Sequence, residues 1–182
     1  MSTKQSILNN LLHDLTICQH LYTKIDASNA NWCPTPKMRT TEELMQYLSN
    51  IGKATIGHLV NPPADRASAM PAAIAASKAA AATVTFANFS EMIELEKTEI
   101  SKYFADITDE DLNRKTYMYF NPSQDITLLD GLLYATRFLC AYRHQLFMYA
   151  KMCGADIATI NNWAGMDAPP AAVKEAVEEE VA

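Results

Sequence analysis

The sequence predicts an all-α protein, a four-helix bundle with a long crossover between its second and third helices. Apolar residues make up 49% of the 182 residues, and there are only five glycines. A sandwich or barrel would need many more turns, so this composition favours helices. Four long segments repeat apolar residues at steps of three and four, the period of one helical face. The length suits one domain, so we expect residues 1–182 to form a single helical bundle domain.

The first predicted helix covers residues 3–25. Its apolar stripe consists of Ile7, Leu11, Leu15, Cys18, Tyr22 and Ile25. A stripe this continuous indicates one face packed against the rest of the bundle. Residues 26–39 contain Pro34 and Pro36 and are predicted to form a loop.

The second predicted helix begins at a capping box. Thr40 is followed by Glu43 three residues later, the spacing at which the two residues satisfy each other's backbone N–H groups. The prolines of Asn61-Pro62-Pro63 end the helix. Gly52 and Gly57 lie inside it, and each costs about 1 kcal/mol relative to alanine in a helix. We therefore expect close packing against a neighbouring helix at the two glycines.

Residues 61–83 are the longest stretch predicted to be irregular, with a helical turn around residues 72–82. The stretch exceeds the usual helix–helix connection. It is long enough to cross the bundle, so the second and third helices need not be antiparallel neighbours. The third helix is predicted over residues 84–107, with these residues facing inward: Phe86, Phe89, Ile93, Ile100, Tyr103 and Phe104.

The fourth predicted helix is the longest, from Asp125 to Gly154. An extended connector over residues 117–120 precedes it, and Gly154 is a natural residue to follow a helix. A shorter segment with Trp163 comes next. The tail, about residues 168–182, is expected to be weakly ordered or a short helix.

Charge and composition exclude several classes of function. The net charge is −6 and there is no basic stripe, so we expect no nucleic-acid partner. There is no signal-peptide pattern and no apolar run of roughly 18 residues, so a cytoplasmic protein without a membrane partner is expected. None of the four cysteines forms a C-x-x-C pair. Cys18, Cys140 and Cys153 are interpreted as buried thiols, and Cys33, in a loop, as the most reactive.

The segment from Phe138 to Gly154 resembles the last bundle helix of the DinB/YfiT-like family. In that family a His-x-x-x-His pair precedes an Arg-Gly-Gln-Leu run. Here the run reads Arg143-His144-Gln145-Leu146, and the histidine positions hold Phe138 and Tyr142. The Glu-Leu and His-Leu pattern of the family's second helix falls on residues 43–48, with Tyr47 in place of the histidine. The resemblance spans most of residues 3–154.

The resemblance implies a DinB-like bundle that lacks the family's usual chemistry. Members typically hold a divalent metal with three histidines, and some are thiol transferases or isomerases. Phenylalanine cannot bind a metal, and tyrosine does so only as a phenolate. We therefore expect no metal and no other cofactor. The matching positions Tyr47, Phe138 and Tyr142 are candidate pocket residues.

Other polar residues allow two readings. Arg143, Gln145 and His13 are candidate neighbours of the pocket, although Arg143 is more simply explained as a tie between helices. Tyr47 and Tyr142 either fill the core or line a residual pocket, and core filling is the simpler reading. The four histidines do not have the spacing of a relocated metal site.

Three functions remain open. The first is a protein of unassigned function that acts as a dimeric scaffold or binding protein; Leu133, Tyr134, Phe147 and Met148, off the inward stripe of the last helix, favour a homodimer. The second is a thiol-dependent transferase or isomerase that uses the pocket between the helices. The third is a module that binds a small apolar ligand.

Overall fold

A computed structural model describes residues 2–167 of the chain. The expected tail over residues 168–182 lies outside this range. The long helices are α1 (Thr3–Tyr22), α2 (Thr41–Val60), α3 (Arg66–Ala81), α4 (Phe89–Ala105) and α5 (Leu128–Met152), and α6 (Thr159–Trp163) is short. Two 3₁₀ turns, η1 (Ala27–Asn29) and η2 (Glu110–Asn113), and two strands, β1 (Lys115–Met118) and β2 (Asn121–Thr127), complete the described chain.

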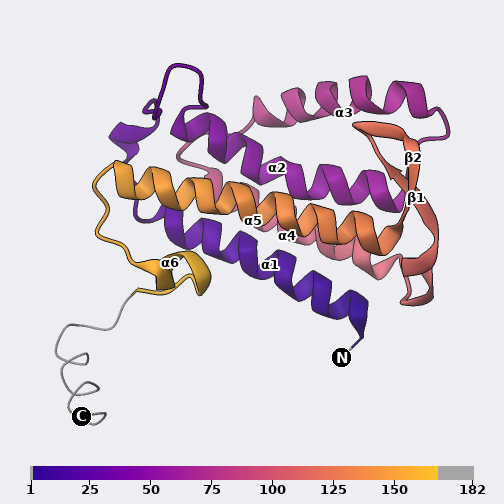
Figure 1. Cartoon of the computed structure of the whole chain (residues 1–182). Helices are drawn as coiled ribbons and strands as arrows, with labels where there is room; N and C mark the ends of the chain where they lie inside the picture. Colours follow the sequence, from indigo (N-terminus) through magenta and orange to yellow (C-terminus); the bar gives the residue numbers. More distant parts are fainter. Residues whose placement is uncertain (1, 168–182) are drawn as a thin grey trace, which may run out of the picture.

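Helices α1, α2, α4 and α5 form the predicted four-helix bundle (Figure 1). Helix α2 packs between α4 and α5, and α1 packs against the same two helices, so α1 and α2 are diagonal. The amide of Gln46 donates to the Val84 carbonyl at 3.0 Å, and the Phe86 N–H donates to the Glu42 carboxylate at 2.7 Å. These bonds join the starts of α2 and α4, which therefore run parallel, as the predicted crossover allows.

The crossover is itself a helix, and here the sequence prediction was wrong. Residues 61–83 were expected to be largely irregular, but α3 covers sixteen of them and lies along the outside of α2 (Figure 1). Asp65 caps it by accepting from the Ala67 N–H at 3.0 Å. Pro71 lies within the helix, so the strong helix propensity of its many alanines outweighs the cost of one proline.

A β-hairpin between α4 and α5 was also missed. Strand β1 pairs antiparallel with β2, with Lys115 opposite Thr127 and Thr116 opposite Ile126. The predicted connector over residues 117–120 is therefore the end of β1 and the turn that follows it. Asp125 belongs to β2, so α5 starts at Leu128 instead, with the Thr127 hydroxyl accepting from the Asp130 N–H at 3.1 Å.

The capping box and the glycines of α2 are as the sequence predicted. The Thr40 hydroxyl accepts from the Glu43 N–H at 3.2 Å, and the Glu43 carboxylate accepts from the Thr40 N–H at 2.7 Å. A Cβ atom at Gly52 would lie 2.6 Å from Glu96 Oε1, and one at Gly57 would lie 2.7 Å from the Tyr103 hydroxyl. Both contacts are with α4, so the glycines allow α2 and α4 to approach closely.

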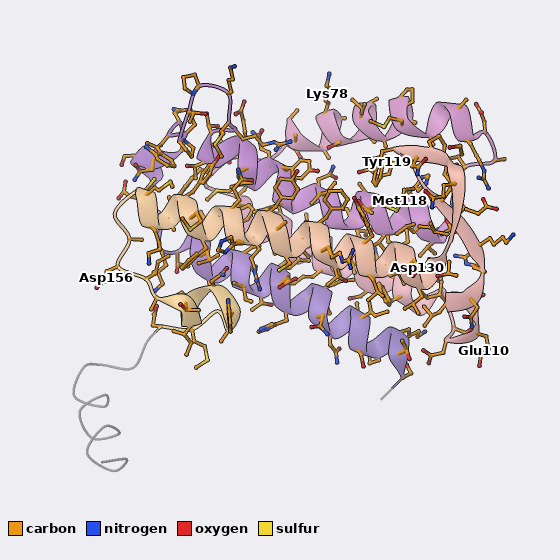
Figure 2. All side chains as sticks on the ribbon, viewed as in Figure 1. Lys78, Glu110, Met118, Tyr119, Asp130 and Asp156 are labelled. Carbon is orange, nitrogen blue, oxygen red and sulfur yellow. The ribbon has the colours of Figure 1, made fainter. Side chains whose placement is uncertain are left out.

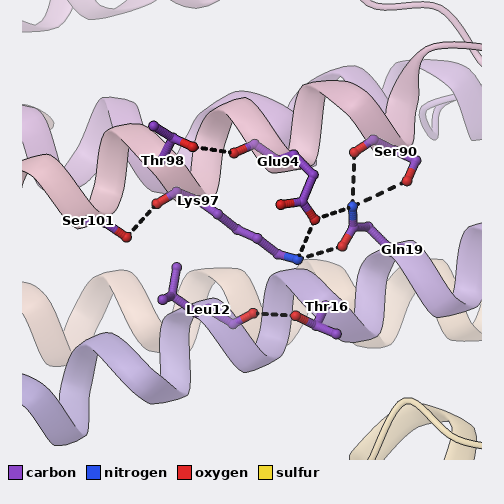
Figure 3. Close-up of polar contacts among 8 residues, drawn as sticks. All are labelled: Leu12, Thr16, Gln19, Ser90, Glu94, Lys97, Thr98 and Ser101. Carbon is purple, nitrogen blue, oxygen red and sulfur yellow. Dashed lines mark hydrogen bonds and ion pairs between the residues drawn. The ribbon is translucent and has the colours of Figure 1, made fainter.

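Polar side chains join α1 to α4 along the outside of the bundle (Figure 3). The Gln19 amide donates to the Ser90 carbonyl at 2.9 Å and to the Glu94 carboxylate at 2.8 Å. The Lys97 ammonium donates to the Gln19 carbonyl and pairs with Glu94 at 2.8 Å. At the other end, the Lys4 ammonium donates to the Phe104 carbonyl in the last turn of α4 and to the Ile107 carbonyl just after it. Helices α1 and α4 are therefore antiparallel neighbours.

Three expectations about single elements need correction. Helix α1 ends at Tyr22 and α4 begins at Phe89, so both are shorter than predicted. Phe147 was expected on the outer surface, but it is buried and its ring is stacked with His144. Cys140 was expected to be buried, but it is exposed.

Gly154 has a φ of 92°, which confirms the predicted glycine stop after α5. Within residues 2–167 no helix has both the length and the apolar content to span a bilayer.

Candidate binding site at an aromatic cluster

The structure brings Tyr47, Phe138 and Tyr142 together between α2 and α5. The Tyr47 and Tyr142 rings have centroids 4.5 Å apart. The Phe138 ring is stacked on that of Tyr142, with 6.4 Å between centroids and an interplanar angle of 13°. Three residues from two distant parts of the sequence thus make one continuous set of contacts.

Further rings extend this set toward the hairpin. Phe138 contacts Tyr134 at 4.8 Å and Phe120 at 6.1 Å between centroids. Phe120 contacts Tyr119, whose ring meets that of His58 edge-on. The spacings fall in the range that aromatic pairs prefer. We call the rings of Tyr47, Tyr119, Phe120, Tyr134, Phe138 and Tyr142 the aromatic cluster.

A cavity of about 750 Å³ lies beside this cluster, between α2 and α3. Tyr47, Ile51 and Ala54 of α2 form one wall, and Ala73 and Ile74 of α3 form the facing wall. Tyr119 of the hairpin also lines it, and Figure 2 shows this residue below α3. The alanines leave room between the helices, because they carry little bulk.

Arg39, in the loop before α2, also lines the cavity. Its guanidinium lies 4.3 Å from the centroid of the Tyr47 ring and 5.7 Å from that of Tyr142. The Tyr149 hydroxyl donates to the Arg39 carbonyl at 2.9 Å. The ring contacts hold the side chain and the hydroxyl holds the backbone, so Arg39 is fixed over the aromatic cluster.

The phenols of the site are kept neutral. Burial, together with the nearby Tyr142 hydroxyl, raises the pKa of Tyr47 above its usual value. Burial also raises the pKa of Tyr119. Both side chains therefore act as neutral hydroxyl groups near pH 7, and neither supplies a phenolate.

The other candidate residues have separate partners. The Arg143 guanidinium forms an ion pair with Asp14 of α1 at 2.7 Å, and both residues are buried. This contact agrees with the expectation that Arg143 ties two helices together. The Gln145 amide donates to the Tyr149 hydroxyl at 3.2 Å. His13 lies 3.2 Å from the Trp163 carbonyl, on the α6 side of α1. None of the three lines the cavity.

A second buried polar group lies deeper in the bundle, on α4. Glu96 has no exposed surface; its Oε1 accepts from the Lys53 N–H at 3.0 Å, and its Oε2 has no partner among the described residues. Burial raises the pKa of Glu96 to about 8, against the lowering effect of that hydrogen bond. At neutral pH most molecules therefore carry a protonated Glu96.

Comparison with known proteins supports the fold. No family model and no curated protein matches the sequence. Among solved structures, the chain is similar to the crystal structure of the DinB-like protein YjoA from Bacillus subtilis, with a TM-score of 0.60 and 15% sequence identity. The match covers 82% of this chain and 92% of that one. This chain has the DinB-like fold.

The residues of the aromatic cluster do not suit a metal ion. Phe138 has no donor atom, and burial disfavours the phenolate form that Tyr47 would need. Across residues 2–167, no group of three or more histidine, cysteine or carboxylate side chains is arranged to hold a metal ion. The four histidines also have separate partners: Trp163, Asn161, Tyr117 and Asn162.

The cysteines do not form part of this site. Cys18 is fully buried in α1, and burial raises the pKa of its thiol far above the usual value. Cys33 is half-buried, and Cys140 and Cys153 lie on α5 and at its end. None of the four lines the cavity.

Two residues that line the cavity, Arg39 and Tyr119, were not recognised from the sequence. Arg39 was placed in a loop and given no role. Tyr119 belongs to the run Tyr117-Met118-Tyr119-Phe120, which was read only as a connector. Three aromatic residues in four positions are unusual for a solvated linker, and this density was the available signal.

Proposed function

We propose that this protein binds a small organic molecule in the cavity between α2 and α3, and that it does not carry out metal-dependent chemistry. The aromatic cluster carries the proposal, because it occupies the position at which the resemblance places metal ligands. We also propose that residues 1–182 form one domain and that the protein acts in the cytoplasm.

The size and lining of the cavity favour binding. Ligand sites usually enclose roughly 300–1,000 Å³ and are mostly apolar with a few polar groups. The cavity here measures about 750 Å³, and its walls combine alanine, isoleucine and tyrosine side chains with Arg39 and Gln46. A molecule with an apolar body fits this lining better than a fully polar one.

A blocking variant tests the proposal with 2-naphthoate as the probe. Ala73→Trp places an indole in the cavity, whereas Ala75→Trp adds the same bulk about 200° around α3, on its exposed side. Isothermal titration should show binding to the wild type and to Ala75→Trp, and none to Ala73→Trp. Absence of binding to the wild type, or equal binding to all three proteins, would show that the proposal is wrong.

We also propose that the protein is a homodimer through the outer face of α5. Leu133, Met148 and Met152 are 47%, 37% and 55% exposed, and their spacing puts them on one side of the helix. A row of large apolar side chains favours a partner surface. Sedimentation at micromolar concentration should give a dimer that Leu133→Asp dissociates. Leu95→Asp, on α4, is the matched control and should leave the dimer intact.

A further inference from the structure

Arg39 is held at the cavity with its hydrogen-bond donors unused. Its guanidinium carbon lies 4.3 Å from the centroid of the Tyr47 ring and 5.7 Å from that of Tyr142, and its side chain is exposed. No carboxylate among residues 2–167 pairs with it, and none of its guanidinium N–H groups donates a hydrogen bond within that part of the chain. A guanidinium that lies over an aromatic ring can still donate through its fork of N–H groups, which matches a carboxylate.

The charged side chains around the cavity also favour an anionic ligand. Lys37, Arg39 and Lys78 line it, and Glu43 is the acidic residue among the lining side chains. The Glu43 carboxylate already accepts from the Thr40 N–H in the capping box. Lys78 points away from α2 in Figure 2, so Arg39 and Lys37 are the cations available at the opening. The opening is therefore positive, although the whole chain has a net charge of −6.

Side chains of α5 hold the backbone of Arg39 in place. The Gln145 amide donates to the Tyr149 hydroxyl, which in turn donates to the Arg39 carbonyl. The Tyr149 ring is packed edge-on against Trp32, with centroids 5.3 Å apart. A residue that is fixed before the ligand arrives loses less conformational entropy on binding.

On the basis of the proposed function, we propose that the ligand is an organic carboxylate with a flat apolar body. The carboxylate pairs with the edge of the Arg39 guanidinium, with Lys37 close to it. The body lies along Tyr47 and Tyr119, between the apolar walls that Ile51 and Ile74 supply. A cationic analogue is repelled at the opening, and a neutral analogue forgoes the charge-assisted hydrogen bonds.

Matched analogues separate the ligand class from binding itself. The full-length protein is titrated with 2-naphthoate, 2-naphthalenemethanol and 2-naphthylmethylammonium, which share one ring system and differ in charge. The acid should bind roughly tenfold more tightly than the alcohol, and the amine more weakly than either. Arg39→Gln should abolish the preference for the acid, because it should weaken binding of the acid far more than binding of the alcohol. Arg137→Gln, at an exposed arginine of α5 outside the cavity, should behave as the wild type.

The outcomes have different meanings. If the alcohol binds as tightly as the acid, and Ala73→Trp blocks both, the carboxylate class is wrong and the proposed binding function stands. Retention of the preference in Arg39→Gln, with a circular dichroism spectrum like that of the wild type, also overturns the class. If no analogue binds to the wild type, the proposed function fails and this inference fails with it.

Discussion

Glu96 is an acidic side chain in a place that favours its neutral form. It lies between α2 and α4, with one oxygen on the Lys53 N–H and the other without a partner in the described chain. An ionised carboxylate there would lose its hydration with a single hydrogen bond in return. This explains why burial raises the pKa of Glu96 to about 8, from an ordinary value of 4.5.

The buried carboxyl should make stability depend on pH. In the unfolded chain Glu96 ionises near pH 4.5, whereas in the folded chain it keeps its proton until about pH 8. Below pH 4.5 both states are protonated and the stability is fully present. As the pH rises from 4.5 to 8, the free energy of unfolding should fall by about 4 kcal/mol.

Glu96→Gln should remove most of this fall, because the amide resembles the protonated acid. Urea unfolding at several pH values measures the effect. Glu99→Gln, at a surface carboxylate of the same helix, is the control and should keep the slope. A slope that is the same in Glu96→Gln and in the wild type would contradict the explanation.

The Asp14–Arg143 ion pair is a second buried polar contact, and here the charge of each side chain has an oppositely charged partner. Both residues are buried, and the two charged atoms are 2.7 Å apart. Arg143→Met leaves a carboxylate buried without its partner, and we expect a loss of about 3–5 kcal/mol in the free energy of unfolding. The double variant Asp14→Leu with Arg143→Met should recover most of that loss. Chemical denaturation of the single and double variants gives the coupling energy directly. A single variant that loses less than about 1 kcal/mol, as at a surface pair, would show that the pair is unimportant.

At the scale of elements, Gly52 sets how closely α2 approaches α4. Alanine normally gains about 1 kcal/mol over glycine in a helix. At this position the new Cβ would lie 2.6 Å from Glu96 Oε1 and 3.2 Å from Ile100 Cδ1, so either these buried side chains must move or the helices must separate. We expect Gly52→Ala to reduce the free energy of unfolding by about 1–2 kcal/mol, because overpacking outweighs propensity.

Thermal and urea unfolding measure this loss. In a Glu96→Ala background the nearest obstacle is absent, so the same substitution at Gly52 should cost less. If Gly52→Ala is more stable than the wild type, the close approach does not limit the packing of α2 on α4.

The elements that the sequence predicted correctly are those with strong local signals. The α2 capping box, the stop at Gly154 and the apolar stripes each depend on residues a few positions apart. The β-hairpin depends on pairing between residues 115–118 and 121–127, and no Asn-Gly or Asp-Gly turn marks it. Helix α3 was predicted only as a helical turn around residues 72–82, because Pro62, Pro63 and Pro71 argue against a longer helix.

At the scale of the whole molecule, the fold was easier to predict than the site. The resemblance grouped Tyr47, Phe138 and Tyr142, and the rings of these residues are in contact in the structure. The cavity needs a wall from α3, a loop residue and a hairpin residue, and their meeting depends on how the crossover packs. No local pattern in the sequence encodes that packing, so Arg39 and Tyr119 emerged only from the structure.

We propose that, in this DinB-like fold, an aromatic cluster stands where the resemblance places a metal centre. Metal analysis of the protein, purified after expression with added zinc, nickel and manganese and then dialysed, tests it most directly. The account predicts metal well below one equivalent per chain, with no change in Tyr47→Phe. Stoichiometric metal that survives dialysis in the wild type and is lost in Tyr47→Phe would contradict it.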